Sequence, residues 1–165
     1  MRTGHILSAL MLMCLITGSA RPQAPQDKPE PLSAFPQSML SIRTHTNHVI
    51  NFKIWTADTP KRDQQGLMFV RSMGEHQGML FLFPQVRRQV AMWMKNTYIP
   101  LDMLFMDRQG RVDYIRANAT PFSEEVIASP GPEYAVLELN GGTAARLGIN
   151  VGDVVLHPAF AKRPP

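Results

Sequence analysis

The apolar residues of this chain come in short runs separated by turn-forming residues, which limits it to folds built from short strands. In the segment V-I-N-F-K-I-W-T, Ile50, Phe52 and Ile54 share one face, as in a half-buried strand. Two short helices are predicted, one over 59–66 and one over Thr143–Leu147. The pattern predicts a mainly β fold, a single-domain β-sandwich or barrel of about seven to eight short strands with two short helices. The further strand-like segments are 39–46, 78–83, 88–94, 101–106, 111–118, 134–139 and 153–157.

The spacing of these segments indicates how they are connected. It leaves no room for repeated helical crossovers, so a parallel sheet of βαβ units is not expected. A turn at Tyr98–Pro100 is predicted to join the segments 88–94 and 101–106. This connection would place Lys95 and Asp102 at facing strand ends, where opposite charges stabilise each other modestly.

The first residues have the order of a secretory signal peptide. Arg2 precedes an apolar run that is too short to span a membrane comfortably, and small residues follow up to Ala20. We therefore expect cleavage near Ala20 and export to the periplasm or the extracellular space. No membrane span is expected in the mature chain.

The remaining sequence divides by composition. Residues 21–37 are rich in proline and are predicted to form an extended linker after the signal peptide of residues 1–20. A single β domain is expected over residues 38–160, which is an ordinary length for one apolar core. Residues 161–165 are predicted to form a frayed tail.

Cysteine content and charge exclude several classes of protein. The single cysteine lies in the predicted signal peptide, so the mature chain has no disulfide framework, cysteine nucleophile or thiolate metal site. The formal net charge is +4, but the basic residues are scattered and do not alternate with aromatic ones. A nucleic-acid partner is therefore not expected.

Four segments, taken in order, resemble a known family. They are Q-G-L-M-F-V-R, G-M-L-F-L-F-P, M-W-M-K-N-T-Y-I-P-L-D-M-L-F-M-D, and Y-A-V-L-E-L-N-G-G followed by G-I-N-V-G-D-V-V. Over about Ile50 to His157 the chain resembles the small prokaryotic proteins called domain of unknown function 192. The resemblance implies a mainly β protein that is often exported, and it implies no activity.

Polar residues interrupt two of the apolar segments. Lys95, Asn96 and Asp102 lie within M-W-M-K-N-T-Y-I-P-L-D, and Glu138 interrupts V-L-E-L with Asn140 at its end. Gathered at one end of a barrel, these side chains could bind a small polar or anionic ligand, including a carbohydrate. Alternatively, the protein is an enzyme in which Asp102 or Glu138 acts as general acid or base.

A purely structural interpretation accounts for the same residues. Asn96 would brace the turn, Lys95 would pair with Asp102, and Glu138 would face water or cap the second helix. A module that contacts partners in the cell envelope is a further interpretation, which an exposed apolar patch or an unpaired sheet edge would favour. The sequence leaves these interpretations open.

Methionine is abundant in the same region and offers soft metal ligands. Met92 and Met94 share one face of a predicted strand, and thioethers suit Cu(I), so Cu(I) binding by this pair is a weaker hypothesis. Methionine also fills β cores, and the histidines are dispersed without zinc-ligand spacing. Apart from the Cu(I) hypothesis, the sequence predicts no metal site and no cofactor, and it favours the polar cluster as the site of a small-molecule ligand.

Overall fold

The computed structural model describes residues 28–84 and 89–160. The predicted signal peptide, the first part of the predicted linker and the predicted tail lie outside these residues. Within them the chain forms nine strands, two short α-helices and two 3-10 turns. In chain order these are η1 (Leu32–Ala34), β1 (Gln37–Arg43), β2 (Val49–Ala57), α1 (Pro60–Gln65), β3 (Gln77–Leu82), β4 (Ala91–Met92), β5 (Leu101–Met106), β6 (Val112–Ala119), β7 (Ile127–Ala128), β8 (Ala135–Asn140), α2 (Thr143–Leu147), β9 (Val154–Leu156) and η2 (Pro158–Phe160).

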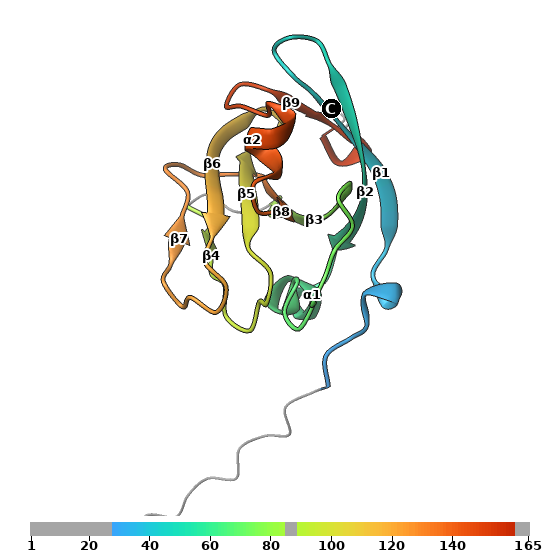
Figure 1. Cartoon of the computed structure of the whole chain (residues 1–165), viewed down its shortest axis with the longest axis vertical. Helices are drawn as coiled ribbons and strands as arrows, with labels where there is room; N and C mark the ends of the chain where they lie inside the picture. Colours follow the sequence, from blue (N-terminus) through green and yellow to red (C-terminus); the bar gives the residue numbers. More distant parts are fainter. Residues whose placement is uncertain (1–27, 85–88, 161–165) are drawn as a thin grey trace, which may run out of the picture.

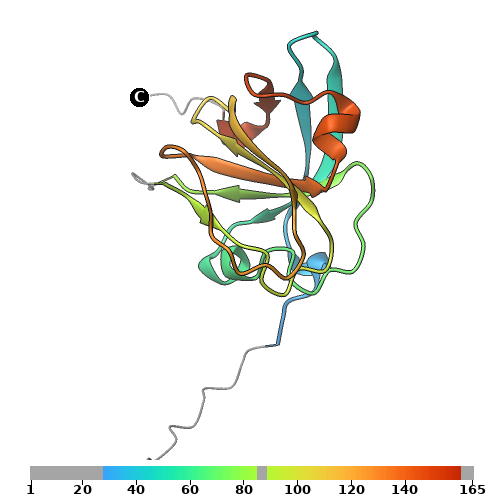
Figure 2. The same cartoon turned by 60° about the vertical axis from the view of Figure 1, so that its left-hand side comes forward.

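Seven of the strands form one curled sheet in the order β6-β5-β8-β3-β2-β1-β9. Its two edge strands meet where Arg111 bridges Val154 and the amide of Val112 donates to the carbonyl of Asp153 at 2.9 Å. The sheet thereby closes into a barrel, with α1 and α2 at opposite ends (Figures 1 and 2). The predicted mainly β fold is confirmed, and of the two predicted architectures the barrel describes the closed sheet.

One strand pair departs from the otherwise antiparallel pattern. β2 and β3 run side by side in parallel, with Trp55 opposite Met79, and the connection between them contains α1. This is a single helical crossover, and every other strand pair in the described residues is antiparallel. The crossover matters for function because it lays α1 against the outside of the sheet.

The predicted hairpin between segments 88–94 and 101–106 is wrong. β4 is only two residues long and pairs with β7 in a separate small sheet, whereas β5 pairs with β6 and β8. The chain leaves β4 early because it turns at Lys95 and Asn96. Lys95 and Asp102 are therefore not cross-strand neighbours.

The barrel has apolar cores on both faces of its central strands. The inner core fills the barrel with side chains such as Phe52, Leu104 and Leu137, and α2 contributes Ala144 to it. The outer core covers β3, β5 and β8 on the other face, beneath α1 and the β4–β7 pair. Because side chains alternate along a strand, Glu138 on β8 points into the outer core, opposite to Leu137.

The last part of the predicted linker packs on the domain. Phe35 is buried in the outer core, and the guanidinium of Arg62 on α1 donates to the carboxylate of Glu30 at 3.0 Å. The amide of Glu30 also donates to the side chain of Gln65 at 2.8 Å. The packed domain therefore begins before residue 38, because apolar and charged side chains follow the prolines.

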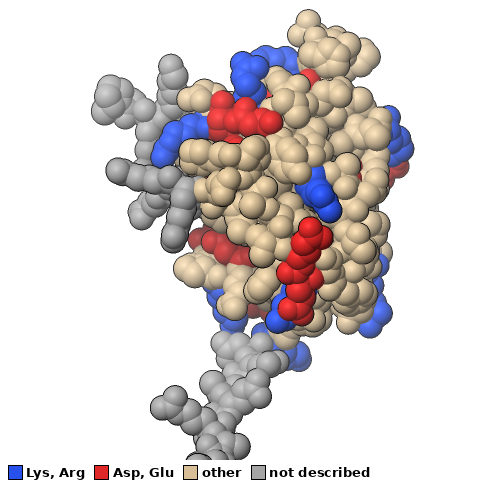
Figure 3. All heavy atoms as spheres, turned by 90° about the vertical axis from the view of Figure 1, so that its left-hand side faces the viewer, with Lys and Arg blue, Asp and Glu red and all other residues tan. Residues whose placement is uncertain are grey.

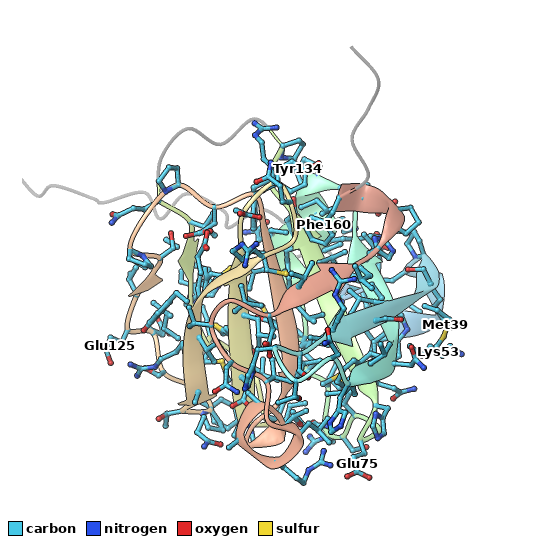
Figure 4. All side chains as sticks on the ribbon, turned by 90° about the horizontal axis from the view of Figure 1, so that it is seen from above. Met39, Lys53, Glu75, Glu125, Tyr134 and Phe160 are labelled. Carbon is cyan, nitrogen blue, oxygen red and sulfur yellow. The ribbon has the colours of Figure 1, made fainter. Side chains whose placement is uncertain are left out.

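The side chains at the barrel surface show where its ends and flanks lie. Tyr134 and Phe160 pack edge to face at one end, with ring centroids 6.0 Å apart (Figure 4). Met39 and Lys53 are register partners on the outside of β1 and β2.

None of the helices within residues 28–84 and 89–160 has the length and apolarity needed to cross a membrane.

Candidate functional site

Asp102 is buried at the barrel end and fixes the start of α2. Its Oδ1 accepts hydrogen bonds from the backbone amides of Asn118 (2.9 Å) and Gly142 (3.0 Å), and its Oδ2 accepts one from Ala144 (2.8 Å). In this way the free backbone amides at the helix start gain a hydrogen-bond acceptor, and the buried carboxylate gains donors. Asp102, rather than Glu138, caps the second helix, and it does not reach Lys95.

Lys95 and Asn96 lie in the turn after β4. Asn96 has a φ of 56°, which asparagine tolerates, and its carbonyl accepts a hydrogen bond from the amide of Phe69 at 2.9 Å. The Lys95 ammonium lies 3.9 Å from a carboxylate oxygen of Glu124 and 5.6 Å from the ring centroid of Trp93. Asn96 therefore braces a turn, but the predicted pair of Lys95 with Asp102 does not form.

Asn140 holds a loop in place. Its side-chain amide donates hydrogen bonds to the carbonyls of Met73 and Gly74, both at 3.0 Å. Both donor hydrogens of the amide are used in these bonds, and the bonds tie the loop before β3 to the end of β8. Asn140 does not line the cavity that Lys95 and Asn96 line.

Glu138 is a buried carboxyl group without a protein partner. It lies between Met79 of β3 and Met103 of β5 in the strand register, and only 4% of the residue is exposed. Among the described residues, none forms a hydrogen bond or an ion pair with its carboxyl group. Burial raises the pKa of Glu138 from 4.5 to about 8, so this group is protonated at neutral pH.

Glu138 lines a cavity of about 110 Å³ that we call the inner pocket. The pocket lies between the outer face of the sheet, α1 and β4, and Asp63 of α1 is the second carboxyl group in its lining. No basic residue of the described segments 28–84 and 89–160 belongs to its lining. The large apolar and aromatic residues of the lining are Leu67, Met68, Phe81, Phe83, Met92 and Trp93.

The pKa of Asp63 is raised, as is that of Glu138. Burial, followed by the nearby charge of Asp58, raises the pKa of Asp63 from 3.8 to about 6. Its Oδ1 is buried and has no hydrogen-bond partner among the described residues. Sequence reasoning missed Asp63 because an acidic residue in the first turn of a helix is common and stabilising, so nothing in the sequence distinguishes it.

A second, larger cavity of about 520 Å³ adjoins the inner pocket, and we call it the rim cleft. The two share Gln64, Gln65, Met68 and Trp93, so they lie side by side along common walls. Among the described residues, the lining of the rim cleft includes three lysines and no acidic residue. These lysines are Lys28, Lys61 and Lys95, and Asn96 lies beside them.

Two exposed aromatic side chains stand in the rim cleft. Trp93 is 44% exposed and Phe69 is 46% exposed. Phe69 also has a φ of 66°, an unusual conformation for a bulky side chain, and its amide is held by the carbonyl of Asn96. The turn at Asn96 therefore helps to place an aromatic ring in the cleft.

Charges elsewhere on the surface are more mixed. On the side that carries β7, Figure 3 shows acidic and basic side chains in small groups separated by uncharged residues. That side offers no continuous surface of one sign. The face in this view therefore has no separation of charge like that between the rim cleft and the inner pocket.

The two methionines predicted as Cu(I) ligands, Met92 and Met94, differ in how deeply they are buried. Met92 lines the inner pocket, whereas Met94 is fully buried in the outer core. Within the described part of the chain, no group of three or more histidine, cysteine, aspartate or glutamate side chains could hold a metal ion.

Of the two carboxyl groups considered for acid–base chemistry, Glu138 faces a cavity and Asp102 is occupied by backbone amides.

The sequence matches one family. The model of the family called domain of unknown function 192, described as "Uncharacterized ACR", matches residues 41–157. The family has no known function. None of the curated proteins matches this chain.

Two solved structures are similar to the whole domain. A protein from Sinorhizobium meliloti 1021, provisionally described as a transcription regulator, has 41% sequence identity and a TM-score of 0.74, covering 76% of this chain and 96% of that one. A protein of unknown function from Novosphingobium aromaticivorans DSM 12444 has 37% identity and a TM-score of 0.73, covering 85% of this chain and 100% of that one. Both similarities agree with the mainly β, single-domain fold.

Proposed function

The chain belongs to the family called domain of unknown function 192, and from this premise we propose that it binds a small, polar, anionic ligand in the rim cleft. One observation carries the proposal, namely that three lysines and no acidic residue line the cleft within residues 28–84 and 89–160. The ordinary alternative for a surface lysine is a solvated side chain with little energetic effect. Three of them around one concave space instead produce a local positive potential that attracts an anion.

The other lining residues fit such a ligand. Asn96 and Gln64 carry side-chain amides that can donate and accept hydrogen bonds, and Trp93 and Phe69 offer exposed rings. Exposed aromatic rings pack against the apolar faces of small ligands, including sugar rings, while amides fix their orientation. A carboxylate or phosphate attached to a small polar body therefore matches the cleft better than an apolar ligand does.

Two of the three lysines already lie near carboxylates, and the first of these is Lys61, whose ammonium is 3.9 Å from a carboxylate oxygen of Glu30. The Lys95 ammonium is 3.9 Å from Glu124, and that glutamate side chain is 66% exposed. An exposed pair at this distance contributes about 0 to 1 kcal/mol and is readily exchanged for another anion. A ligand carboxylate can therefore replace Glu124 at little cost.

We place this binding activity outside the cytoplasm, because the first twenty residues have the order of a secretory signal peptide. Expression of the full chain with a C-terminal tag, followed by cell fractionation and mass spectrometry of the tagged protein, tests this assignment. We expect the protein in the periplasmic or extracellular fraction with its N-terminus near Arg21. Recovery of the uncleaved chain in the cytoplasm would refute export.

Titration of the protein with hexanoate, glucuronate and inorganic phosphate, followed by amide NMR, tests the proposed binding site. We expect shifts at Gln64, Phe69 and Asn96 and at the indole of Trp93. The Lys95→Ala variant should bind the best of these anions about tenfold more weakly, and added salt should weaken binding as well.

Lys53→Ala is the matched control for this titration. Lys53 is exposed on the outside of β2 and does not line the rim cleft, so its removal lowers the net charge equally without touching the site. Equal weakening in the two variants would mean that the anion responds to net charge alone. That result, or shifts remote from the rim cleft, would overturn the proposal.

A further inference from the structure

We propose that the ligand is a small zwitterion, whose ammonium group enters the inner pocket against the carboxyl groups of Glu138 and Asp63 while its anionic group stays among the lysines of the rim cleft. This inference rests on the proposed function and adds the chemical class of the ligand. An aliphatic ω-amino acid is the simplest molecule of this class.

The two parts of the site have opposite and complementary linings. In the part of the chain that the structure describes, the inner pocket is lined by two acidic residues and no basic one, and the rim cleft by three lysines and no acidic residue. Met68 and Trp93 line both parts together with Gln64 and Gln65, so a ligand that spans the two parts would contact apolar side chains and side-chain amides at their boundary. A ligand with one charge of each sign satisfies both linings at once.

Glu138 is the group that points to a ligand in the inner pocket. Only 4% of the Glu138 residue is exposed, and its carboxyl group lines the cavity without a protein partner among the described residues. The buried Oδ1 of Asp63 is unpartnered in the same way. Buried groups of this kind cost stability unless a bound molecule satisfies them, and two acidic groups favour a cation.

The remaining lining also suits an ammonium group. Trp93, Phe81 and Phe83 place three aromatic rings around the pocket. Ring faces attract cations, and this attraction is larger in a site from which water is excluded. The cavity of about 110 Å³ has room for a small ammonium head and not for a whole metabolite. The rest of the ligand must therefore lie in the rim cleft.

The protonation of Glu138 gives this inference a pH dependence. Asp63 of α1 is the other titratable acid in the lining, and the residues that flank Glu138 in the strand register are Met79 and Met103. Burial holds the pKa of Glu138 at about 8, so an arriving ammonium group displaces its proton at neutral pH. Affinity for the cation should then increase as the pH rises, by up to about tenfold for each pH unit, and level off above about pH 8.

Isothermal titration calorimetry with three carboxylate probes tests the inference. The probes are ω-aminohexanoate, its neutral analogue ω-hydroxyhexanoate, and hexanoate, each titrated into the purified mature chain from about pH 6 to about pH 9. A shorter probe, ω-aminobutanoate, examines the span between the two parts of the site. Buffers of different ionisation enthalpy report the proton released from Glu138.

We expect the amino probe to bind at least about tenfold more tightly than the hydroxy probe at about pH 8. Its affinity should rise with pH, with release of a proton, while the affinity of the hydroxy probe should not rise. Glu138→Gln should remove the advantage of the amino probe and its pH dependence, and Asp63→Asn should reduce the advantage. Lys95→Ala should weaken all three probes by a similar factor.

The outcomes separate this inference from the proposed function. If both amino probes bind no more tightly than the hydroxy probe, or keep their advantage in Glu138→Gln, the zwitterion inference is wrong. Hexanoate binding that still depends on Lys95 would then leave the proposed function in place. If no probe depends on Lys95, the proposed function fails, even where an amine binds through Glu138.

Discussion

Ionisation of Glu138 should cost the folded protein about 4 kcal/mol of unfolding free energy as the pH rises from about 5 to about 9, and Glu138→Gln should remove this part of the loss. The pKa of Glu138 is raised by burial from 4.5 to about 8 in the folded protein. The folded chain therefore holds a proton that the unfolded chain releases above pH 4.5. This contribution to stability is complete below that pH and is lost as the pH rises through about 8.

Urea denaturation at a series of pH values measures this effect, and Glu133→Gln is the matched control. Burial, with the charges of Asp113 and Asp107, raises the pKa of Glu133 from 4.5 to about 6. Glu133→Gln should therefore flatten the stability profile only up to about pH 6 and leave the loss at higher pH unchanged. A wild-type profile that stays flat between about pH 6 and pH 9 would show that Glu138 is ionised or solvated in the fold.

Asp102→Ala should lower the free energy of unfolding by about 3 to 5 kcal/mol. The substitution leaves three backbone amides, those of Asn118, Gly142 and Ala144, without their carboxylate acceptor. Two of these amides belong to the start of α2, so the helix that closes the barrel end should loosen as well.

Two further variants test whether the loss of stability in Asp102→Ala comes from the lost hydrogen bonds of this carboxylate. Asp102→Asn keeps one acceptor oxygen and should lose roughly half as much stability as Asp102→Ala. Glu125→Ala removes an exposed carboxylate that lies at the periphery in Figure 4, and it should change stability by no more than about 0.5 kcal/mol. A loss below about 1 kcal/mol in Asp102→Ala would contradict the structural role given to this residue.

The strands and helices could largely be predicted because local patterns determine them. The alternation of Ile50, Phe52 and Ile54 corresponds to β2, whose inward residues include Phe52 and Ile54. The second helix has the predicted bounds, and Gly148 ends it with a φ of 66°, which glycine adopts without strain. Such features depend on neighbours in the sequence, so the sequence is sufficient to find them.

Pairings between distant segments could not be predicted in the same way. β4 and β5 are close in sequence, but β4 pairs with Ile127–Ala128, a two-residue strand too short to leave a pattern. The predicted contact between Lys95 and Asp102 depended on the wrong pairing. Nothing in the local sequence distinguishes a strand that continues into a hairpin from one that leaves the sheet.

The two buried acids illustrate the same limit within the site. Asp102 and Glu138 both interrupt apolar strands, and both are buried in the fold. Asp102 faces the amides at the start of α2, whereas Glu138 faces a cavity beneath α1. Which of them retains a free carboxyl group depends on tertiary packing. The polar interruption was a correct signal of unusual positions, and only the structure assigns them different roles.

The rim cleft could not have been assembled from the sequence at all. Its lysines come from residues 28, 61 and 95, which lie in the segment before β1, in α1 and in the turn after β4. Each looks like an ordinary surface residue when it is considered alone. They share one cavity because the β2–α1–β3 crossover lays α1 beside the turn that carries Lys95 and Asn96.

The central claim is that Glu138 remains a neutral, unpartnered acid at the wall of a ligand pocket. A carbon-detected NMR titration of the Glu138 side-chain carboxyl in the mature protein tests it directly. The structure predicts a midpoint near pH 8, well above the ordinary value of 4.5. Addition of a bound ω-amino acid should lower this midpoint, because an ammonium group favours the ionised carboxylate. A midpoint near 4.5 in the free protein would contradict the account.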